Sequence, residues 1–260
     1  MGKDTNISWT HHTANFWWGC QKVSPGCKNC YADTYSKRLG KDIWGPPATT
    51  TREVKKAIWH NIQKWDYEAE KAGERRRVFV QSMSDFLEDH PMVHEWRESA
   101  KVFLAGCKNL DIQMLTKRPE NAPLFLADWY ESWPKHIWMG TSVENQEQAD
   151  KRIPQLLKIP APVRFLSVEP MLEPINILGY LLKDLHKWDR KIHWVIAGGE
   201  SGAGYRELNI DGVWWLHDQC RDAGTAFFVK QDSGLFPGRQ GRIPDALFIQ
   251  EFPKTERRPL

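Results

Sequence analysis

Six short apolar segments, separated by helical patterns, constrain the fold of this 260-residue chain more than any other feature. They are rich in β-branched and aromatic residues and read as continuous buried strands, which is typical of a parallel sheet covered on both faces. These segments span 77–85, 110–120, 136–145, 163–171, 192–202 and 225–234. The alternation of strand and helix predicts an α/β fold with right-handed crossovers.

The length of the chain suits either two small domains or one α/β barrel, since barrels of about 250 residues are common. No linker or low-complexity tract separates the segments, so we expect a single domain over residues 1–260. The β/α series should run from about 75 to 235, followed by a C-terminal tail at about 236–260. Residues 14–18 are expected to form a short first strand, and residues 52–72 a helix.

Every predicted strand ends in polar residues. In chain order these ends read SMSD, TKRPE, TSVEN, SVEP, GGESG and KQDSG. In parallel α/β architectures the carboxyl ends of the strands meet at one edge, where binding and catalytic sites form. We therefore expect a functional site at this edge of the sheet.

Three of the five cysteines lie in one short loop, residues 17–33, before the strand series. Cys20, Cys27 and Cys30 follow a C-x6-C-x2-C spacing, and the Ser-Pro-Gly turn at 24–26 can fold the first thiol back toward the other two. An odd set of three thiols cannot form a closed disulfide set but can hold a metal. The remaining cysteines, Cys107 and Cys220, have helical contexts and are interpreted as core residues.

Two metal centres compete for the three thiols. Structural zinc needs four ligands and would have to recruit His11 or His12, and no second C-x2-C knuckle is present. A 4Fe–4S cluster held by three thiolates instead leaves one iron open to another ligand. The spacing favours the cluster and leaves zinc as the alternative.

The composition of the chain excludes few classes of protein other than membrane-spanning ones. The net charge of +3 is too balanced to indicate a nucleic-acid partner by itself. The N-terminus carries no apolar signal segment, and no run of 18 apolar residues occurs, so we expect a cytoplasmic protein without a membrane partner. Unpaired thiols agree with such a reducing compartment.

The motif set resembles one branch of the radical S-adenosylmethionine (SAM) superfamily. The motifs on which the resemblance rests are GCQKVSPGCKNCYA (19–32), SMSD (82–85), LTKRPE (115–120), SVEP (167–170) and GGESG (198–202). The usual superfamily spacing is C-x3-C-x2-C. The longer first gap is similar to that of a phage- and prophage-associated branch long described only as a phage protein of unknown function. The resemblance implies a single partial (β/α)6-type, TIM-like barrel with an N-terminal iron–sulfur cluster loop.

The resemblance also implies a cofactor chemistry. Cys20, Cys27 and Cys30 would ligate three irons of a 4Fe–4S cluster, and the fourth iron would bind S-adenosylmethionine. An electron from an external donor then cleaves this cofactor to methionine and a 5'-deoxyadenosyl radical, which abstracts hydrogen from a substrate. The residues expected to contact the cofactor are Tyr31, Ser82, Ser84, Asp85, Lys117, Ser142, Glu144, Glu169, Gly198 and Gly199. Those expected to face substrate are Arg118, Glu200 and Lys230.

Simpler readings of several of these residues stay open. The Ser and Asp side chains at 82–85 are also good helix N-caps, and the cations at 117–118 could be surface charge. The glycines at 198–199 suit close backbone approach to a ligand. No residue is assigned to catalysis.

The phage resemblance suggests a substrate connected with nucleic acid, such as a hypermodified thymine base in phage DNA that is isomerised or coupled. Radical modification of RNA or of a peptide, with or without a partner protein, is the second enzyme hypothesis. A hypothesis from another class is a zinc-stabilised nucleic-acid-binding protein without catalysis.

Overall fold

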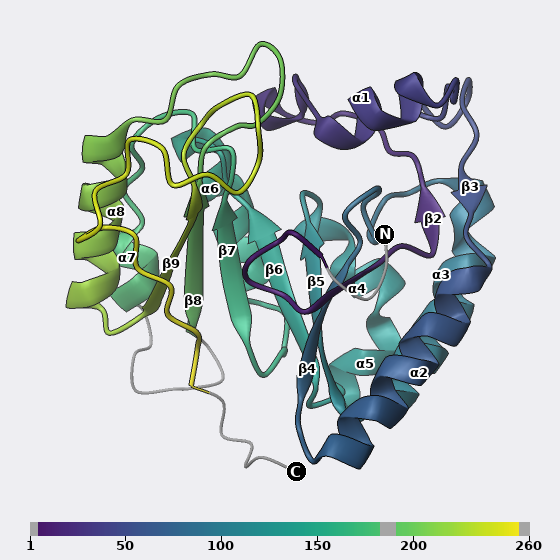
Figure 1. The fold of residues 1–260 in the computed structure, drawn as a ribbon. Helices are drawn as coiled ribbons and strands as arrows, with labels where there is room; N and C mark the ends of the chain where they lie inside the picture. Colours follow the sequence, from purple (N-terminus) through teal and green to yellow (C-terminus); the bar gives the residue numbers. More distant parts are fainter. Residues whose placement is uncertain (1–4, 183–190, 255–260) are drawn as a thin grey trace.

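Seven parallel strands form one sheet that curls into a half-barrel in the computed structural model, which describes residues 5–182 and 191–254 (Figure 1). The strand order is β1-β4-β5-β6-β7-β8-β9, so neighbours in the sheet follow the order of the chain. The bounds are β1 His12–Ala14, β4 Arg76–Val80, β5 Leu110–Thr116, β6 Ile137–Ser142, β7 Arg164–Val168, β8 Trp194–Gly198 and β9 Ala226–Gln231. The prediction of an α/β fold with a parallel sheet is confirmed.

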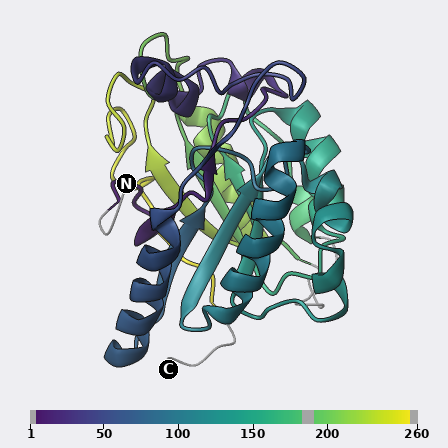
Figure 2. The ribbon, with the colours of Figure 1, turned by 90° about the vertical axis from the view of Figure 1, so that its right-hand side faces the viewer.

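Helices cover the outer face of this sheet, and Figure 2 shows α2 and α3 side by side against it. Their bounds are α2 Ala57–Ala72, α3 His94–Gly106, α4 Ala122–Phe125, α5 Ala127–Glu131, α6 Gln146–Leu156, α7 Leu178–Leu182 and α8 Ile210–Asp222. In α2, Ile58, Ile62, Trp65 and Ala69 recur at helical spacing and form its buried stripe. The helix ends at Gly73, whose φ of 64° lies in the left-handed region that favours glycine.

The two faces of the sheet differ in composition because side chains alternate along each strand. The helix-facing positions are mainly aliphatic and join the large core. The concave face carries an aromatic cluster made of Trp9, Phe79, Trp138, Phe165, Trp194 and Phe228. The Phe165 ring packs directly on Gly140, because a Cβ at that position would lie only 2.5 Å from the ring. The aromatic cluster therefore fills the inner side of the half-barrel.

The six strands predicted after residue 75 are all present. The expected strand at 14–18 is divided: β1 ends at Ala14, and β2, Trp17–Trp18, pairs antiparallel with β3, Glu53–Val54. The division has a cause far away in the sequence, because the amides of Phe16 and Trp17 donate to Oε1 of Gln81 instead of continuing the ladder. The expected helix at 52–72 begins later, at Ala57, because Glu53 and Val54 form β3.

One further helix and three 3-10 turns belong to the described chain. α1, Tyr31–Arg38, lies across the carboxyl edge of the sheet, above the strand ends (Figure 1). Single 3-10 turns occur at Pro25–Cys27, Pro91–Val93 and Pro119–Asn121. After β9 the chain returns along the sheet, where Phe252 packs 5.4 Å from the Trp194 ring. None of the helices within the described residues is both long and apolar enough to span a membrane.

Two buried glutamines differ in whether their side-chain amides are hydrogen-bonded. Gln113 is fully buried on the concave side of β5, and neither atom of its amide has a hydrogen-bond partner among the described residues. Gln219 is also buried, but it accepts from the amides of Ile177 and Leu178 and donates to the carbonyl of Ile175.

Gln113→Met is therefore expected to raise the free energy of unfolding by about 1–3 kcal/mol, because it removes unpaired buried polar atoms. Gln219→Met should lower it by about 1–3 kcal/mol, because it leaves backbone groups unpaired. Chemical denaturation of both variants measures the difference. A destabilising Gln113→Met would show that this amide has a partner in solution.

Candidate functional site

The cysteine loop, residues 17–33, is held against the carboxyl edge of the sheet by contacts to three different strand ends. The amide of Gly26 donates to Oε1 of Glu144 after β6, at 3.1 Å. Asn29 donates to Oε2 of Glu200 after β8, at 2.9 Å, and the Tyr31 hydroxyl donates to the carbonyl of Ser82 after β4, at 2.7 Å. The loop therefore covers the edge where the sequence predicts a site.

Cys20 lies at the start of this loop, buried beside a cation. Nη1 of Arg118 is 3.6 Å from its Sγ and 2.9 Å from Oδ2 of Asp85, and Nη2 donates to the carbonyl of Gln21 at 2.7 Å. Burial raises the pKa of the Cys20 thiol above its usual range, although Arg118 acts in the opposite direction. Arg118 thus joins the cysteine loop to the end of β5.

Asp85 is the counter-charge in this contact. Besides Arg118, it accepts hydrogen bonds from the hydroxyl of Thr116 at 2.6 Å and from the amide of Lys117 at 2.9 Å. Burial alone would raise the pKa of this carboxyl, but Arg118 and the other donors outweigh burial and lower it. Asp85 is therefore held as an anion inside the protein, in the role of an anchor for Arg118.

A second buried ion pair supports the same loop. Glu88 accepts from Nε of Arg52 at 2.8 Å and from the amide of Gln21 at 2.6 Å. The same guanidinium donates to the carbonyls of Ile43 and Gly45, so it also fixes the segment that follows α1. Glu88 thus connects Gln21, at the beginning of the cysteine loop, to Arg52 and through it to the segment after α1.

The other two cysteines of the loop, Cys27 and Cys30, are half-buried, and their thiols interact electrostatically. Burial raises the pKa of the Cys30 thiol; the amides of Asp33 and Ala32 oppose this, the neighbouring Cys27 adds to it, and Lys117 opposes it. The ammonium group of Lys117 forms no ion pair or hydrogen bond with any residue the structure describes. Its positive charge acts on the Cys30 thiol and on the carboxylate of Glu144, whose pKa it helps to lower against burial.

The donor chemistry of the three thiols fits an iron–sulfur cluster, but their positions fit it only in part. Cys27 and Cys30 interact electrostatically, whereas the thiol of Cys20 is engaged by Arg118. Across residues 5–182 and 191–254, no three His, Cys, Asp or Glu side chains are grouped so that they could hold a metal ion. Metal binding would also require the thiols to lose their protons.

Buried charge pairs line the rest of the edge. Glu144 pairs with Arg152 at 2.8 Å, and a Cβ at Gly26 would lie only 2.9 Å from its carboxyl carbon. Glu200 pairs with Arg206 at 2.5 Å, and Arg206 also donates to the carbonyl of Pro25 in the cysteine loop. Only a glycine at position 26 therefore lets the loop lie this close to β6.

The last two strands contribute a half-buried ion pair and a close backbone approach. Lys230 of β9 pairs with Glu169, which follows β7. Beside them, a Cβ at Gly199 would lie 2.2 Å from the amide nitrogen of Ser233. The small size of Gly199 is thus required by the chain's own backbone after β9.

A family model described as "Protein of unknown function (DUF5131)" matches residues 4–248. The chain belongs to the DUF5131 family. No curated protein matches the chain, and no solved structure does. The DUF5131 region spans every residue of the site, from Cys20 to Lys230.

The structure brings most of the predicted residues of this DUF5131 chain to one edge, in different states. Lys117, Glu169 and Lys230 are partly exposed there. Arg118, Asp85 and Glu144 are buried in ion pairs, and Ser142 is buried with its carbonyl accepting from Arg152.

The predicted serines after β4 bind other parts of the chain. Ser84 donates to the carbonyl of Trp17, and Ser82 is bound to Asn15 and Tyr31. Gly198 stands beside the side chain of Glu169, and Glu200 holds the cysteine loop. Cys107 and Cys220 are core residues, as predicted.

Sequence reasoning missed Glu88, Arg52, Asn29 and Arg206, all of which hold the cysteine loop or its neighbouring segment. No local signal marks them, because their partners lie far away in the sequence. Asn29 and Glu200, for example, are separated by 171 positions.

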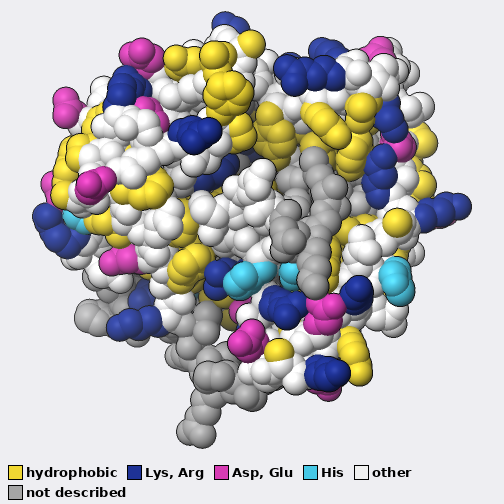
Figure 3. Space-filling view, in the orientation of Figure 1, with side chains coloured by type: hydrophobic (Ala, Val, Ile, Leu, Met, Phe, Trp, Pro, Cys, Tyr) yellow, Lys and Arg dark blue, Asp and Glu magenta, His cyan; other side chains and the backbone are white. Residues whose placement is uncertain are grey.

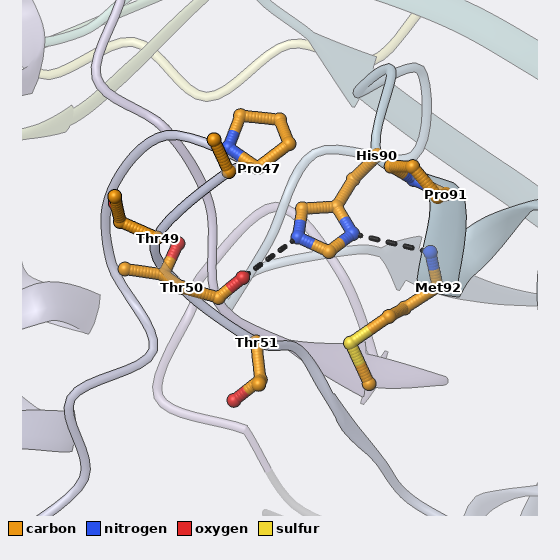
Figure 4. A pocket seen from close by; sticks show the side chains of 8 residues that line it. Pro47, Thr49, Thr50, Thr51, His90, Pro91 and Met92 are labelled. Atoms are coloured by element: carbon orange, nitrogen blue, oxygen red, sulfur yellow. Dashed lines mark hydrogen bonds between the residues drawn. The ribbon is translucent and has the colours of Figure 1, made fainter.

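One hollow of about 350 Å³ lies beside this site, between residues 47–51 and 90–92 (Figure 4). Both ring nitrogens of its buried His90 are engaged: Nε2 meets the carbonyl of Thr50 at 3.0 Å, and Nδ1 accepts from the amide of Met92 at 3.2 Å. The hollow presents no free titratable side chain, and we assign it no chemistry.

Proposed function

We propose that this DUF5131 chain is a radical SAM enzyme. The observation that carries the proposal is the position of the three-cysteine loop, which covers the carboxyl edge of a curled parallel sheet, where the charge of Lys117 acts on the Cys30 thiol. Sites of parallel α/β proteins form at this edge. On this proposal the half-barrel is a partial TIM-like barrel, and residues 17–33 are its iron–sulfur loop.

The roles of the residues follow from their surroundings. Cys20, Cys27 and Cys30 would hold a 4Fe–4S cluster, which supplies the electron that cleaves SAM. Lys117 offers a positive charge for a carboxylate, such as that of the methionine part of SAM. Arg118 holds the backbone of the loop through Gln21, so it is a positioning residue and not a substrate contact.

The aromatic cluster and the loop have a protective role. The cluster fills the inner side of the sheet, and the loop covers its carboxyl edge, so both would limit the access of bulk water to this edge. Exclusion of water prevents side reactions of reactive intermediates. The Glu169–Lys230 pair provides polar groups for SAM or substrate at this edge.

The proposal requires further components. An external electron donor must reduce the cluster, and a cytoplasmic setting would keep the thiols reduced. We propose a nucleic-acid substrate, with a hypermodified thymine base in phage DNA as the specific candidate.

Anaerobic reconstitution with iron and sulfide tests the enzyme class. We expect about four irons and four sulfides per chain. Addition of SAM and a strong reductant should then release 5'-deoxyadenosine, measured by liquid chromatography. Stoichiometric zinc, with no iron uptake and no SAM cleavage, would instead support a zinc-stabilised binding protein and refute the proposal.

A further inference from the structure

The outer face of the cysteine loop and α1 combines unpaired positive charge with exposed aromatic rings. Residues 17–38 contain four basic residues and one acidic residue, a net charge of +3 that equals the net charge of the whole chain. The single acid, Asp33, is buried and paired with Lys22 at 2.8 Å and Lys37 at 3.1 Å. The positive charge of the chain is therefore concentrated over the candidate site.

Two of these cations have no counter-charge. The side chains of Lys28, before α1, and Arg38, in its last turn, are exposed and form no ion pair with any residue the structure describes. The carboxylates beneath the loop do not neutralise them, because Glu144 is paired with Arg152 and Glu200 with Arg206. An anionic partner would meet uncompensated charge here.

Two aromatic rings of α1 are exposed. Tyr31 is 49% exposed and Tyr35 is 43% exposed. They are four residues apart, so they lie on one face of α1, about 6 Å from each other along the helix axis. Tyr35 is supported from behind by Trp18, with ring centroids 5.9 Å apart. Figure 3 shows hydrophobic and basic side chains together along this upper edge of the molecule.

We propose that this surface, formed by Lys28, Tyr31, Tyr35 and Arg38, binds single-stranded nucleic acid. Bases stack on exposed aromatic rings, and Lys and Arg neutralise phosphates, so two rings flanked by two cations suit a strand of any sequence. An acidic peptide would satisfy the cations but leave the two rings without stacking partners. A lipid surface would need a continuous aliphatic face, which a helix of eight residues carrying two tyrosines does not offer.

The proposed binding surface lies next to the candidate site. α1 begins directly after Cys30, and the Tyr31 hydroxyl is bound to the carbonyl of Ser82 at the strand ends. A strand lying along α1 would thus bring one base to the carboxyl edge of the sheet, which the cysteine loop covers. The inference rests on the proposed function in treating the strand as substrate, whereas the binding itself needs no cluster.

Fluorescence anisotropy of the full-length chain with a fluorescein-labelled 12-nucleotide oligothymidine tests the inference. The double variant Lys28→Glu/Arg38→Glu should weaken binding at least about tenfold and reduce the slope of log K against log salt by about 1.4, since two phosphate contacts are lost. Tyr35→Ala should weaken binding about tenfold through the loss of one stacked base. Circular dichroism confirms that each variant is folded.

The matched controls lie on α2, away from the site. Tyr67 is 63% exposed, and Lys71 is exposed in the last turn. Tyr67→Ala and Lys71→Glu should leave the affinity unchanged. Unchanged affinity of the α1 variants, an equal loss in the α2 variants, or tighter binding to phosphatidylserine vesicles or polyglutamate would each overturn the inference.

Oligonucleotide binding and iron uptake, measured on the same chain, test this inference and the proposed function separately. A chain that takes up iron and cleaves SAM but does not bind the oligonucleotide refutes the nucleic-acid surface alone. A chain that binds the oligonucleotide through α1 but takes up no iron refutes the radical SAM proposal alone.

Discussion

Cys27→Ala is expected to abolish the iron–sulfur cluster and, with it, the cleavage of SAM. Three thiolates are the minimum that the proposed cluster can use, so the loss of one should reduce iron from about four per chain to less than about one after reconstitution. The release of 5'-deoxyadenosine should fall at least a hundredfold. Iron analysis, visible absorption and chromatography of the product measure the two effects.

Cys107→Ala is the matched control, because Cys107 is a buried thiol outside the loop whose Sγ donates to the carbonyl of Phe103 at 3.4 Å. It should retain the full iron content and activity. Full iron in Cys27→Ala, or an equal loss in Cys107→Ala, would contradict the assignment of the ligands.

Glu88→Gln is expected to lower the free energy of unfolding by about 3–5 kcal/mol, because it leaves the guanidinium of Arg52 buried without its counter-charge. Both side chains are almost fully buried, at 0% and 2% exposure for Arg52 and Glu88. The variant should also loosen the cysteine loop, since Glu88 accepts from the amide of Gln21. Denaturant unfolding measures the stability, and hydrogen exchange in residues 17–33 measures the loosening.

Asp218→Asn provides the comparison for an ion pair on the surface. Asp218 pairs with Arg221 at 2.6 Å, and both side chains are exposed. Water screens such a pair, so the free energy of unfolding should remain nearly unchanged. If Glu88→Gln were as mild as Asp218→Asn, the Arg52–Glu88 pair would not be buried in solution.

Much of the sheet was predictable from the sequence. Continuous apolar runs such as that ending at Val80 are a local signal, and all six predicted strands after residue 75 are present. The strand expected at 14–18 was not predictable as observed, because Oε1 of Gln81 takes the amides of Phe16 and Trp17 out of the ladder. That contact joins residues more than 60 positions apart.

The candidate site was predictable in its position but not in its electrostatics. Polar residues at the ends of parallel strands must meet at one edge, so Lys117, Glu144 and Glu200 could be placed there in advance. Arg118 was expected to face a substrate, yet it is buried between Asp85 and Cys20. Whether a cation faces solvent or a buried carboxylate depends on which distant segments pack over it.

Hydrophobic periodicity is encoded within each segment, so the α/β class, the order of the six main strands and the edge at which the polar residues gather follow from the sequence. The tertiary structure alone decided what holds the cysteine loop in place. Glu88 with Arg52 and Asp85 with Arg118 are anchors only because folding removes them from water, where isolated charges would need no partner.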